Sequence, residues 1–203
     1  MPPTKIMIIR HGEKPPKSGG EPHGVTPAGE HDLDGLIVQG WERAGALGRL
    51  FAPYDGAPLR AGLAQPDFLY AAGVDAASKS VRSEEVLSVV RGLLPKAPYD
   101  QSFGPDAYKK AAESILAKTG TVLVAWEHHM IKHLVKHITG QDGLAPYWCS
   151  DRFDMVLVLD AAGGKWTLTQ VPQMVLPTDS TTPLPADKSG CTSDDGSADA
   201  DLD

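Results

Sequence analysis

The stretch Lys5–Pro15, KIMIIRHGEKP, decides the fold expected for the rest of the chain. Residues 6–9 are four consecutive apolar residues, and such a run, rich in branched side chains, is typical of a strand buried on both faces. Arg10 and His11 follow directly, so a guanidinium and an imidazole stand at the carboxyl end of this strand. At that end of a parallel strand, α/β proteins bind their ligands. Gly12 then allows a sharp turn close to a ligand.

Two later segments place polar side chains in a similar way. Residues 121–126, TVLVAW, predict another buried strand, and Glu-His-His follows at 127–129. Arg82 lies at the start of a helix predicted over 81–94, where unpaired N–H groups and the helix dipole favour an anion. If the strands are parallel, these polar groups meet at one edge of the sheet. The residues expected at that edge are Arg10, His11, Arg82 and His128.

These segments together resemble the histidine phosphatase superfamily, the phosphoglycerate-mutase-like phosphatases. Residues 10–12, Arg-His-Gly, are similar to the family signature that follows its first strand. Residues 78–85, SKSVRSEE, resemble the segment that carries the family's second phosphate-binding arginine, here Arg82. The predicted strand at 121–126 corresponds to the one that ends at the family's second histidine, here His128. The resemblance covers most of the chain, from about residue 5 to residue 170.

The resemblance implies an enzyme, a phosphatase that hydrolyses phosphomonoesters or phosphohistidine without a metal ion or another cofactor. It implies that His11 is the nucleophile and forms a phosphohistidine intermediate, while Arg10, Arg82 and His128 hold the phosphoryl group. Paired guanidinium groups match phosphoryl oxygens, and a neutral imidazole can attack phosphorus. A phosphatase is favoured over a mutase, because the sequence shows no extra cluster of basic residues to retain the intermediate. The expected partner is a phosphorylated small molecule or phosphoprotein.

The general acid that protonates the leaving group stays open among Glu127, Asp100 and Asp106. Glu127 is included among the catalytic residues because it adjoins His128 in the sequence. The alternation of side chains along a strand could nevertheless direct it away from the site. Without an effective acid, substrates with good leaving groups, such as phosphohistidine or aryl phosphates, would be favoured.

Three further residues are candidates for the pocket: Glu13, Lys14 and His129. His129 stands where the family usually has glycine, and Ile37 stands where a hydroxyl residue often touches the phosphate. Because of these two departures, a different function stays open: a non-catalytic module of the same fold that binds phosphate or a phosphoprotein without hydrolysing it. Phosphate binding without a phosphoenzyme would indicate such a module.

A metal-binding protein is the second alternative. His129, His133 and His137 are spaced four residues apart and could share one face of a helix predicted over 130–139. Two such histidines can bind Zn²⁺ or Ni²⁺. An exposed polar helix face is the simpler interpretation, so no metal is assigned to the protein.

The periodicity of apolar residues predicts an α/β three-layer sandwich. A mostly parallel central sheet is expected to be flanked by helices and to end in a C-terminal antiparallel edge hairpin. The expected strands are at 6–9, 67–71, 121–126, 155–159 and 166–171, and the expected helices at 38–51, 81–94, 105–118 and 130–139. Residues 12–35 are rich in glycine and proline and predict a long loop beside the site. One domain over 1–177 and a flexible acidic tail over 178–203 complete the prediction.

Composition narrows the class of protein further. The formal net charge is −7 and there is no basic run, which argues against nucleic acid as a partner. The sequence contains no apolar span of membrane length and no signal-peptide pattern, so a cytoplasmic protein is expected, away from membranes. Cys149 and Cys191 are far apart in the sequence, and a disulfide between them is not expected. The oligomeric state is left open.

Overall fold

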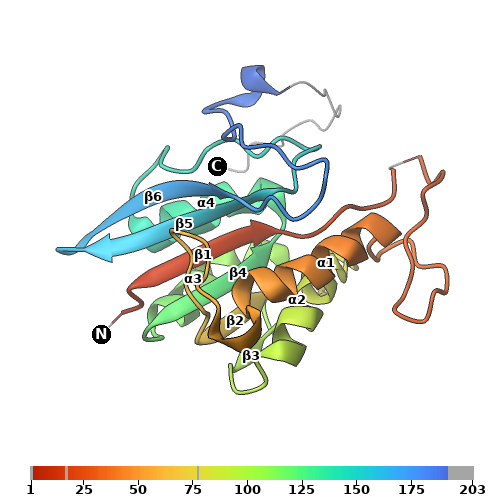
Figure 1. Ribbon diagram of the computed structural model, residues 1–203. Coiled ribbons are helices and arrows are strands. Elements are labelled where there is room, and N and C mark those ends of the chain that lie inside the picture. Colours follow the sequence, from red (N-terminus) through yellow and green to blue (C-terminus); the bar gives the residue numbers. More distant parts are fainter. Residues whose placement is uncertain (1, 17, 77, 192–203) are drawn as a thin grey trace.

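The computed structural model describes residues 2–16, 18–76 and 78–191. Its centre is a six-stranded sheet with the strand order β3-β2-β4-β1-β5-β6 (Figure 1). The strands are β1 (Lys5–Arg10), β2 (Phe68–Ala71), β3 (Tyr99–Asp100), β4 (Thr121–Trp126), β5 (Met155–Ala162) and β6 (Lys165–Pro172). Strands β1 to β4 are parallel, whereas β5 pairs antiparallel with β1 and with β6. The mostly parallel sheet with a C-terminal antiparallel hairpin is therefore confirmed.

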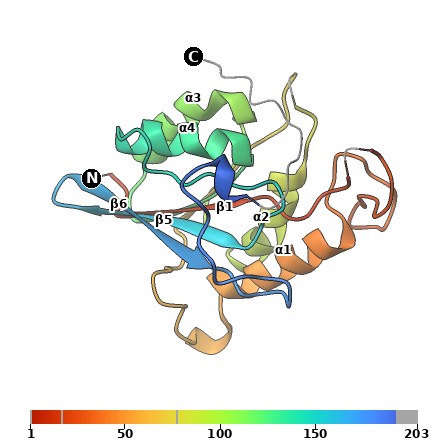
Figure 2. The same ribbon diagram turned by 90° about the horizontal axis from the view of Figure 1, so that it is seen from above.

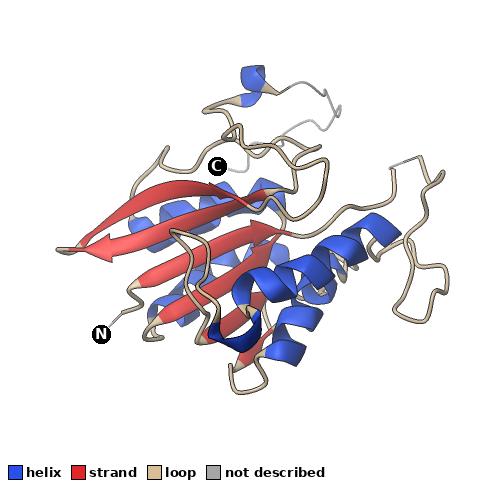
Figure 3. Cartoon of the chain, viewed as in Figure 1, coloured by secondary structure: helices blue, strands red, loops and turns tan. Residues whose placement is uncertain are grey.

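Two pairs of helices cover the two faces of the sheet (Figures 2 and 3). They are α1 (Val38–Phe51) and α2 (Arg82–Leu93) on one face, and α3 (Tyr108–Leu116) and α4 (His128–Thr139) on the other. The alternation of side chains along β1 explains this arrangement. Ile6 and Ile8 are buried in the core under α3 and α4, while Met7 and Ile9 are buried in the core under α1 and α2. These layers confirm the predicted three-layer sandwich.

The register of the sheet aligns the polar segments at its carboxyl edge. Lys5 of β1 pairs with Thr121 of β4, and Arg10 pairs with Trp126, so both strands end at the same level. The residues that follow them in the sequence therefore leave the sheet side by side. This edge is also where the chain enters the long loop before α1 (Figure 1).

Several boundaries differ from the sequence prediction. The short strand β3 lies in a segment for which no strand was expected, and β5 extends to Ala162. Helix α4 begins at His128 rather than at residue 130, because the strand ends at Trp126 and the chain turns directly into the helix. Short 3₁₀ turns occur at Tyr54–Gly56, Pro105–Ala107 and Lys188–Gly190. The earlier helix start places both His128 and His129 in the first turn of α4.

The structure differs from the expected flexible tail over residues 178–191, which pack against the domain. Leu184 is buried, and its backbone N–H and carbonyl both bind the side-chain amide of Gln170. The backbone N–H of Ser180 donates to the carboxylate of Asp154 at 2.7 Å. A few apolar and polar anchors thus fix a segment whose composition alone suggested disorder. Residues 192–203, the rest of the predicted tail, lie outside the described residues.

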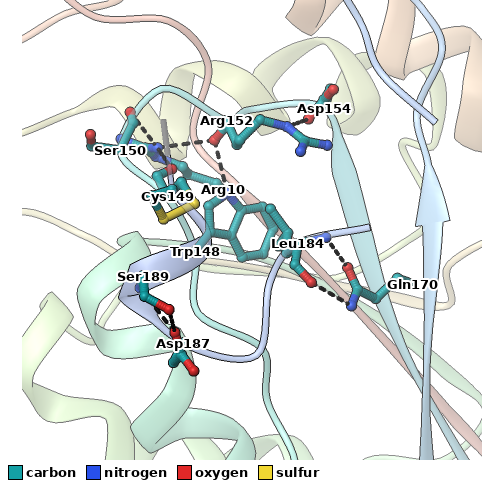
Figure 4. The surroundings of a disulfide bond; sticks show 11 residues. Arg10, Trp148, Cys149, Ser150, Arg152, Asp154, Gln170, Leu184, Asp187 and Ser189 are labelled. Atoms are coloured by element: carbon teal, nitrogen blue, oxygen red, sulfur yellow. Dashed lines mark hydrogen bonds and ion pairs between the residues drawn. A yellow bond between two sulfur atoms is a disulfide. The ribbon is translucent and has the colours of Figure 1, made fainter. Parts of the chain in front are cut away.

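The two cysteines form a disulfide, which corrects the prediction made from their distance in the sequence (Figure 4). Cys149 lies in the segment between α4 and β5, and Cys191 ends the segment that folds back over the domain. This return brings their Cα atoms to 5.6 Å, within the range that a disulfide spans. In the described part of the chain, no helix is long and apolar enough to cross a membrane.

Candidate active site

His11 follows β1 and is buried. Its Nδ1 lies 2.7 Å from the carbonyl oxygen of Gly12. Because a carbonyl can only accept a hydrogen bond, Nδ1 carries the proton and Nε2 keeps a free lone pair. Burial and the charge of Arg10 hold the pKa of His11 well below its usual value, with smaller contributions from His128 and Arg82, against the opposing effect of the Gly12 hydrogen bond. His11 is therefore neutral near pH 7, which is the state a nucleophile requires.

Arg10 is fully buried beside His11. Its Nη1 donates to the backbone carbonyls of Cys149, Ser150 and Arg152 at 3.1, 2.8 and 3.0 Å (Figure 4). The carbon at the centre of its guanidinium lies 4.1 Å from the centre of the Phe153 ring, a cation–π distance. One end of the guanidinium is thus fixed by the loop at 149–153, which sets the orientation of the rest of the group.

Arg82 is the first residue of α2, and its side chain reaches the loop before α1. Its Nε donates to the carbonyl of Gly35 at 3.0 Å, and its Nη2 donates to the carbonyl of Leu33 at 2.8 Å. Partial burial lowers the pKa of Arg82. The guanidinium is also close enough to His11 to lower the pKa of the imidazole by its charge. Arg82 therefore lies near His11, and its role in holding a phosphoryl group stays a prediction.

His128 lies just beyond the neighbouring strand β4, and its ring lies near that of His11. Their ring centres are 6.3 Å apart and the rings are almost perpendicular, at 84°. His128 is the first residue of α4, and its side chain is buried. The shared edge of β1 and β4 therefore brings together two imidazoles and the guanidinium of Arg10, as the order of motifs predicted. An edge that gathers two imidazoles and a guanidinium can receive an anionic group.

Glu127 is the candidate acid that the structure places at the site. Its Oε1 lies 3.1 Å from Nδ1 of His128 and 4.0 Å from Nε2 of His129. The alternation of the strand does not apply to it, because Glu127 is already the N-cap of α4. Asp100 instead accepts hydrogen bonds from the backbone and hydroxyl of Ser102. Asp106 lies in the 3₁₀ turn before α3. Neither aspartate has a described contact with His11 or His128 that would favour it as the general acid.

The three pocket candidates have different positions. Glu13 does not contribute a free carboxylate to the pocket, because it forms a buried ion pair with Arg43, with Nη2 and Oε1 2.7 Å apart. Lys14 is half-buried in the loop after β1. His129 lies beside the site, with its ring centre 3.8 Å from that of His128. Glu13 therefore has a structural contact with Arg43, and its place in the pocket stays a prediction.

Arg43, which sequence reasoning missed, holds together the surroundings of the site. Besides Glu13, it binds the Asp179 carboxylate at 2.8 Å and the Gln173 side-chain oxygen at 2.7 Å. Burial opposes its charge, but the hydrogen bonds to Glu13 and Asp179 raise the pKa of Arg43 overall. An arginine four residues before Leu47 on the apolar face of α1 was the signal that could have revealed it.

The structure bears on two alternatives, the phosphate contact at position 37 and a metal site formed by histidines of α4. Ile37 is the buried N-cap of α1 and makes no side-chain capping bond, so the family's hydroxyl contact is lacking at that position. His133 and His137 both contact the ring of Tyr108, at 5.4 and 6.5 Å between ring centres. Within the described ranges, the one group of three side chains that could hold a metal ion is Glu127, His128 and His129.

Neither a family model nor a curated protein matches this sequence. Many solved structures are similar to this chain, among them the following two. A candidate phosphohistidine phosphatase, SixA, from Agrobacterium tumefaciens has 18% identity and a TM-score of 0.51, with 83% of this chain and 97% of that chain covered. The YhfR protein of Bacillus stearothermophilus has 15% identity and a TM-score of 0.50, with coverage of 81% and 95%. The chain therefore has the fold of these two proteins, with the mostly parallel sheet between two helix layers that was predicted.

Proposed function

We propose that this protein is a phosphatase that transfers the phosphoryl group of a phosphomonoester or of phosphohistidine to His11 and then to water. The observation that carries the proposal is the state of His11. The imidazole is neutral, its tautomer is fixed by Gly12, and its ring lies beside Arg10 and His128. A histidine with a purely structural role would have no need of this combination.

In the first step, Nε2 of His11 attacks phosphorus in line and forms an N–P bond. At the same time the bond from phosphorus to the leaving oxygen of a monoester, or to the leaving nitrogen of a phosphohistidine, breaks. The electron pair of the broken bond goes to the leaving group, which takes a proton from the acid. We assign this role to Glu127, because its carboxylate adjoins His128. In the second step, the Glu127 carboxylate takes a proton from water as the water oxygen attacks phosphorus. The electron pair of the N–P bond returns to Nε2, so that inorganic phosphate, neutral His11 and protonated Glu127 are formed.

The surrounding donors stabilise the transferred group. Arg10 and Arg82 supply positive charge for the non-bridging oxygens, and His128 supplies a further N–H donor. Because the nucleophile is an imidazole and the charge is supplied by side chains, the proposed reaction needs no metal ion. The substrate is a phosphorylated small molecule or phosphoprotein whose identity depends on the loop before α1.

The compartment in which the enzyme works is part of the proposal. A cytoplasmic location was expected from the sequence, whereas structural disulfides persist mainly in oxidising environments. The Cys149–Cys191 disulfide therefore favours a location outside the reducing cytosol. Quantifying free thiols in protein isolated from its source under thiol-blocking conditions would decide between the two.

The decisive experiment is turnover of p-nitrophenyl phosphate by the wild type and by His11→Ala, each with and without a chelator. The proposal predicts metal-independent turnover that is lost in His11→Ala, together with an acid-labile phosphoenzyme after a rapid quench. His133→Ala is the matched control, because this histidine packs against Tyr108 instead of His11. Unchanged turnover in His11→Ala would refute the mechanism.

The same experiment tests the binding module suggested by Ile37. The loss of a hydroxyl at this buried position removes a phosphate contact that the resemblance implies. Binding of inorganic phosphate without turnover or phosphoenzyme, in the wild type as in His11→Ala, would favour the module. Turnover would exclude it.

A further inference from the structure

Glu127, His128 and His129 place three potential metal ligands around one point. One ligand atom from each residue lies within 4.8 Å of the other two. The carboxylate oxygen Oε1 of Glu127 is 3.1 Å from Nδ1 of His128 and 4.0 Å from Nε2 of His129. Three consecutive residues can converge in this way because the chain changes from strand to helix at Glu127.

These separations suit a tetrahedral metal ion. Zinc binds imidazole nitrogen and carboxylate oxygen at about 2.0–2.2 Å, which places neighbouring ligand atoms about 3.4 Å apart. The observed 3.1 and 4.0 Å bracket this value and all three ligand atoms lie within 4.8 Å of one another, so small movements of the side chains would complete the geometry. Two imidazoles with one carboxylate form a recognised ligand set for zinc, and they are poorly suited to magnesium, which prefers oxygen.

A small cavity beside the two rings provides room for a fourth ligand. It has a volume of about 20 Å³ and is lined by His128, His129 and Trp148, among others. This is enough for one water molecule. Lys132 also lines the cavity, so its charge favours a neutral or anionic fourth ligand.

We propose that Glu127, His128 and His129 bind a divalent transition metal of the zinc type, and that the bound metal inhibits the phosphatase. The inhibitory part rests on the proposed function. When Glu127 coordinates the metal, it can no longer deliver a proton to the leaving group. When Nδ1 of His128 coordinates the same ion, the ring is held by the metal instead of adjusting to the phosphoryl group. His129, which replaces the glycine usual in the family, thereby gains a role as the third ligand.

Charge limits the strength of this site. Arg10 and Arg82 act on the neighbouring His11, and their positive charges oppose a second cation nearby. Glu127 contributes the one anionic ligand of the group. The metal is therefore expected to bind reversibly, as a regulator does, and to be removed by a chelator without unfolding the domain.

The test is isothermal titration calorimetry of the intact protein with Zn²⁺ in a phosphate-free buffer. One equivalent should bind to the wild type, and His129→Ala should weaken this binding at least tenfold. His133→Ala is the matched control, because it removes a histidine from the next turn of the same helix and should leave the affinity unchanged. Wild-type affinity in His129→Ala, or a loss in His133→Ala instead, would overturn the proposed site.

Two further readouts separate the site from the proposed activity. Co²⁺ bound in place of Zn²⁺ should give the intense visible absorption of a tetrahedral site in the wild type, and His129→Ala should lose it. Zn²⁺ should inhibit the turnover of p-nitrophenyl phosphate by the wild type, while His129→Ala resists inhibition. Binding that depends on His129 but leaves turnover unchanged would overturn the inhibitory role alone. Calorimetry reports on the metal even if no substrate is turned over.

Discussion

Reduction of the Cys149–Cys191 disulfide should lower the free energy of unfolding by about 4 kcal/mol. The two cysteines are 42 residues apart, and closing a loop of that length in the unfolded chain has an entropic cost of this size at 25 °C. The measurement is urea denaturation followed by fluorescence and circular dichroism, with and without a dithiol reductant. In the reaction, the dithiol is oxidised to its cyclic disulfide and the protein gains two thiols.

The perturbation should also reach the active site, because Arg10 is held by the carbonyls of Cys149, Ser150 and Arg152. Loosening this loop should weaken the competitive binding of inorganic phosphate several-fold. Cys191→Ser provides the matched control: it should reproduce both effects, and the reductant should then change nothing further. If the stability falls by less than about 1 kcal/mol on reduction, or if the reductant still acts on Cys191→Ser, the reasoning is refuted.

Three other predictions concern single side chains. Arg43→Met should destabilise the protein by about 3–5 kcal/mol in urea titrations, because it leaves Glu13 and Asp179 without their shared cation. Arg49→Met on the same helix is the control and should change the stability little. A small effect of Arg43→Met would contradict the assigned role. Glu127→Gln should lower the turnover of an alkyl phosphate by about 10²–10⁴-fold and spare p-nitrophenyl phosphate, and equal losses on both substrates would remove Glu127 as the acid. Because the pKa of His11 is depressed, protonation of this histidine should not lower kcat/KM between neutral pH and pH 6.5. Activity should fall only at a pH well below 6.5, when His11 becomes protonated and can no longer act as the nucleophile. The unfolded state binds the proton more readily than the folded state, so the contribution of His11 to stability should fall as the pH drops through about 6.5; His11→Asn should abolish that part of the pH dependence, and an unchanged profile would contradict it.

The residues at the edge of the sheet were predictable because their positions depend on local patterns. Arg10 and His11 follow one apolar run, and Glu127 follows another. A parallel pairing of β1 and β4 therefore brings these residues together. The one inference needed beyond the pattern was the direction of the strands. The same reasoning gave the layers of the fold, since alternation along a strand buried on both faces requires a helix layer on each side.

The supports of the site could not be predicted, because they depend on contacts between distant segments. The bond from Arg10 to the carbonyl of Cys149 spans 139 positions in the sequence, and a backbone carbonyl leaves no trace in residue type. Asp179 lies in a segment whose composition resembles a disordered tail, yet its side chain is buried against Arg43. The start of α4 was misplaced by two residues, which concealed the approach of Glu127 to His128.

The central position of β1 has a consequence for the synthesis of the protein. Its neighbours β4 and β5 lie more than a hundred residues later in the sequence, so β1 is translated long before either of the strands that pair with it. At ordinary rates of translation, its apolar residues wait on the order of ten seconds for a partner. During that interval the nascent chain exposes an aggregation-prone strand, and chaperones that bind short apolar segments should be the first proteins to meet it.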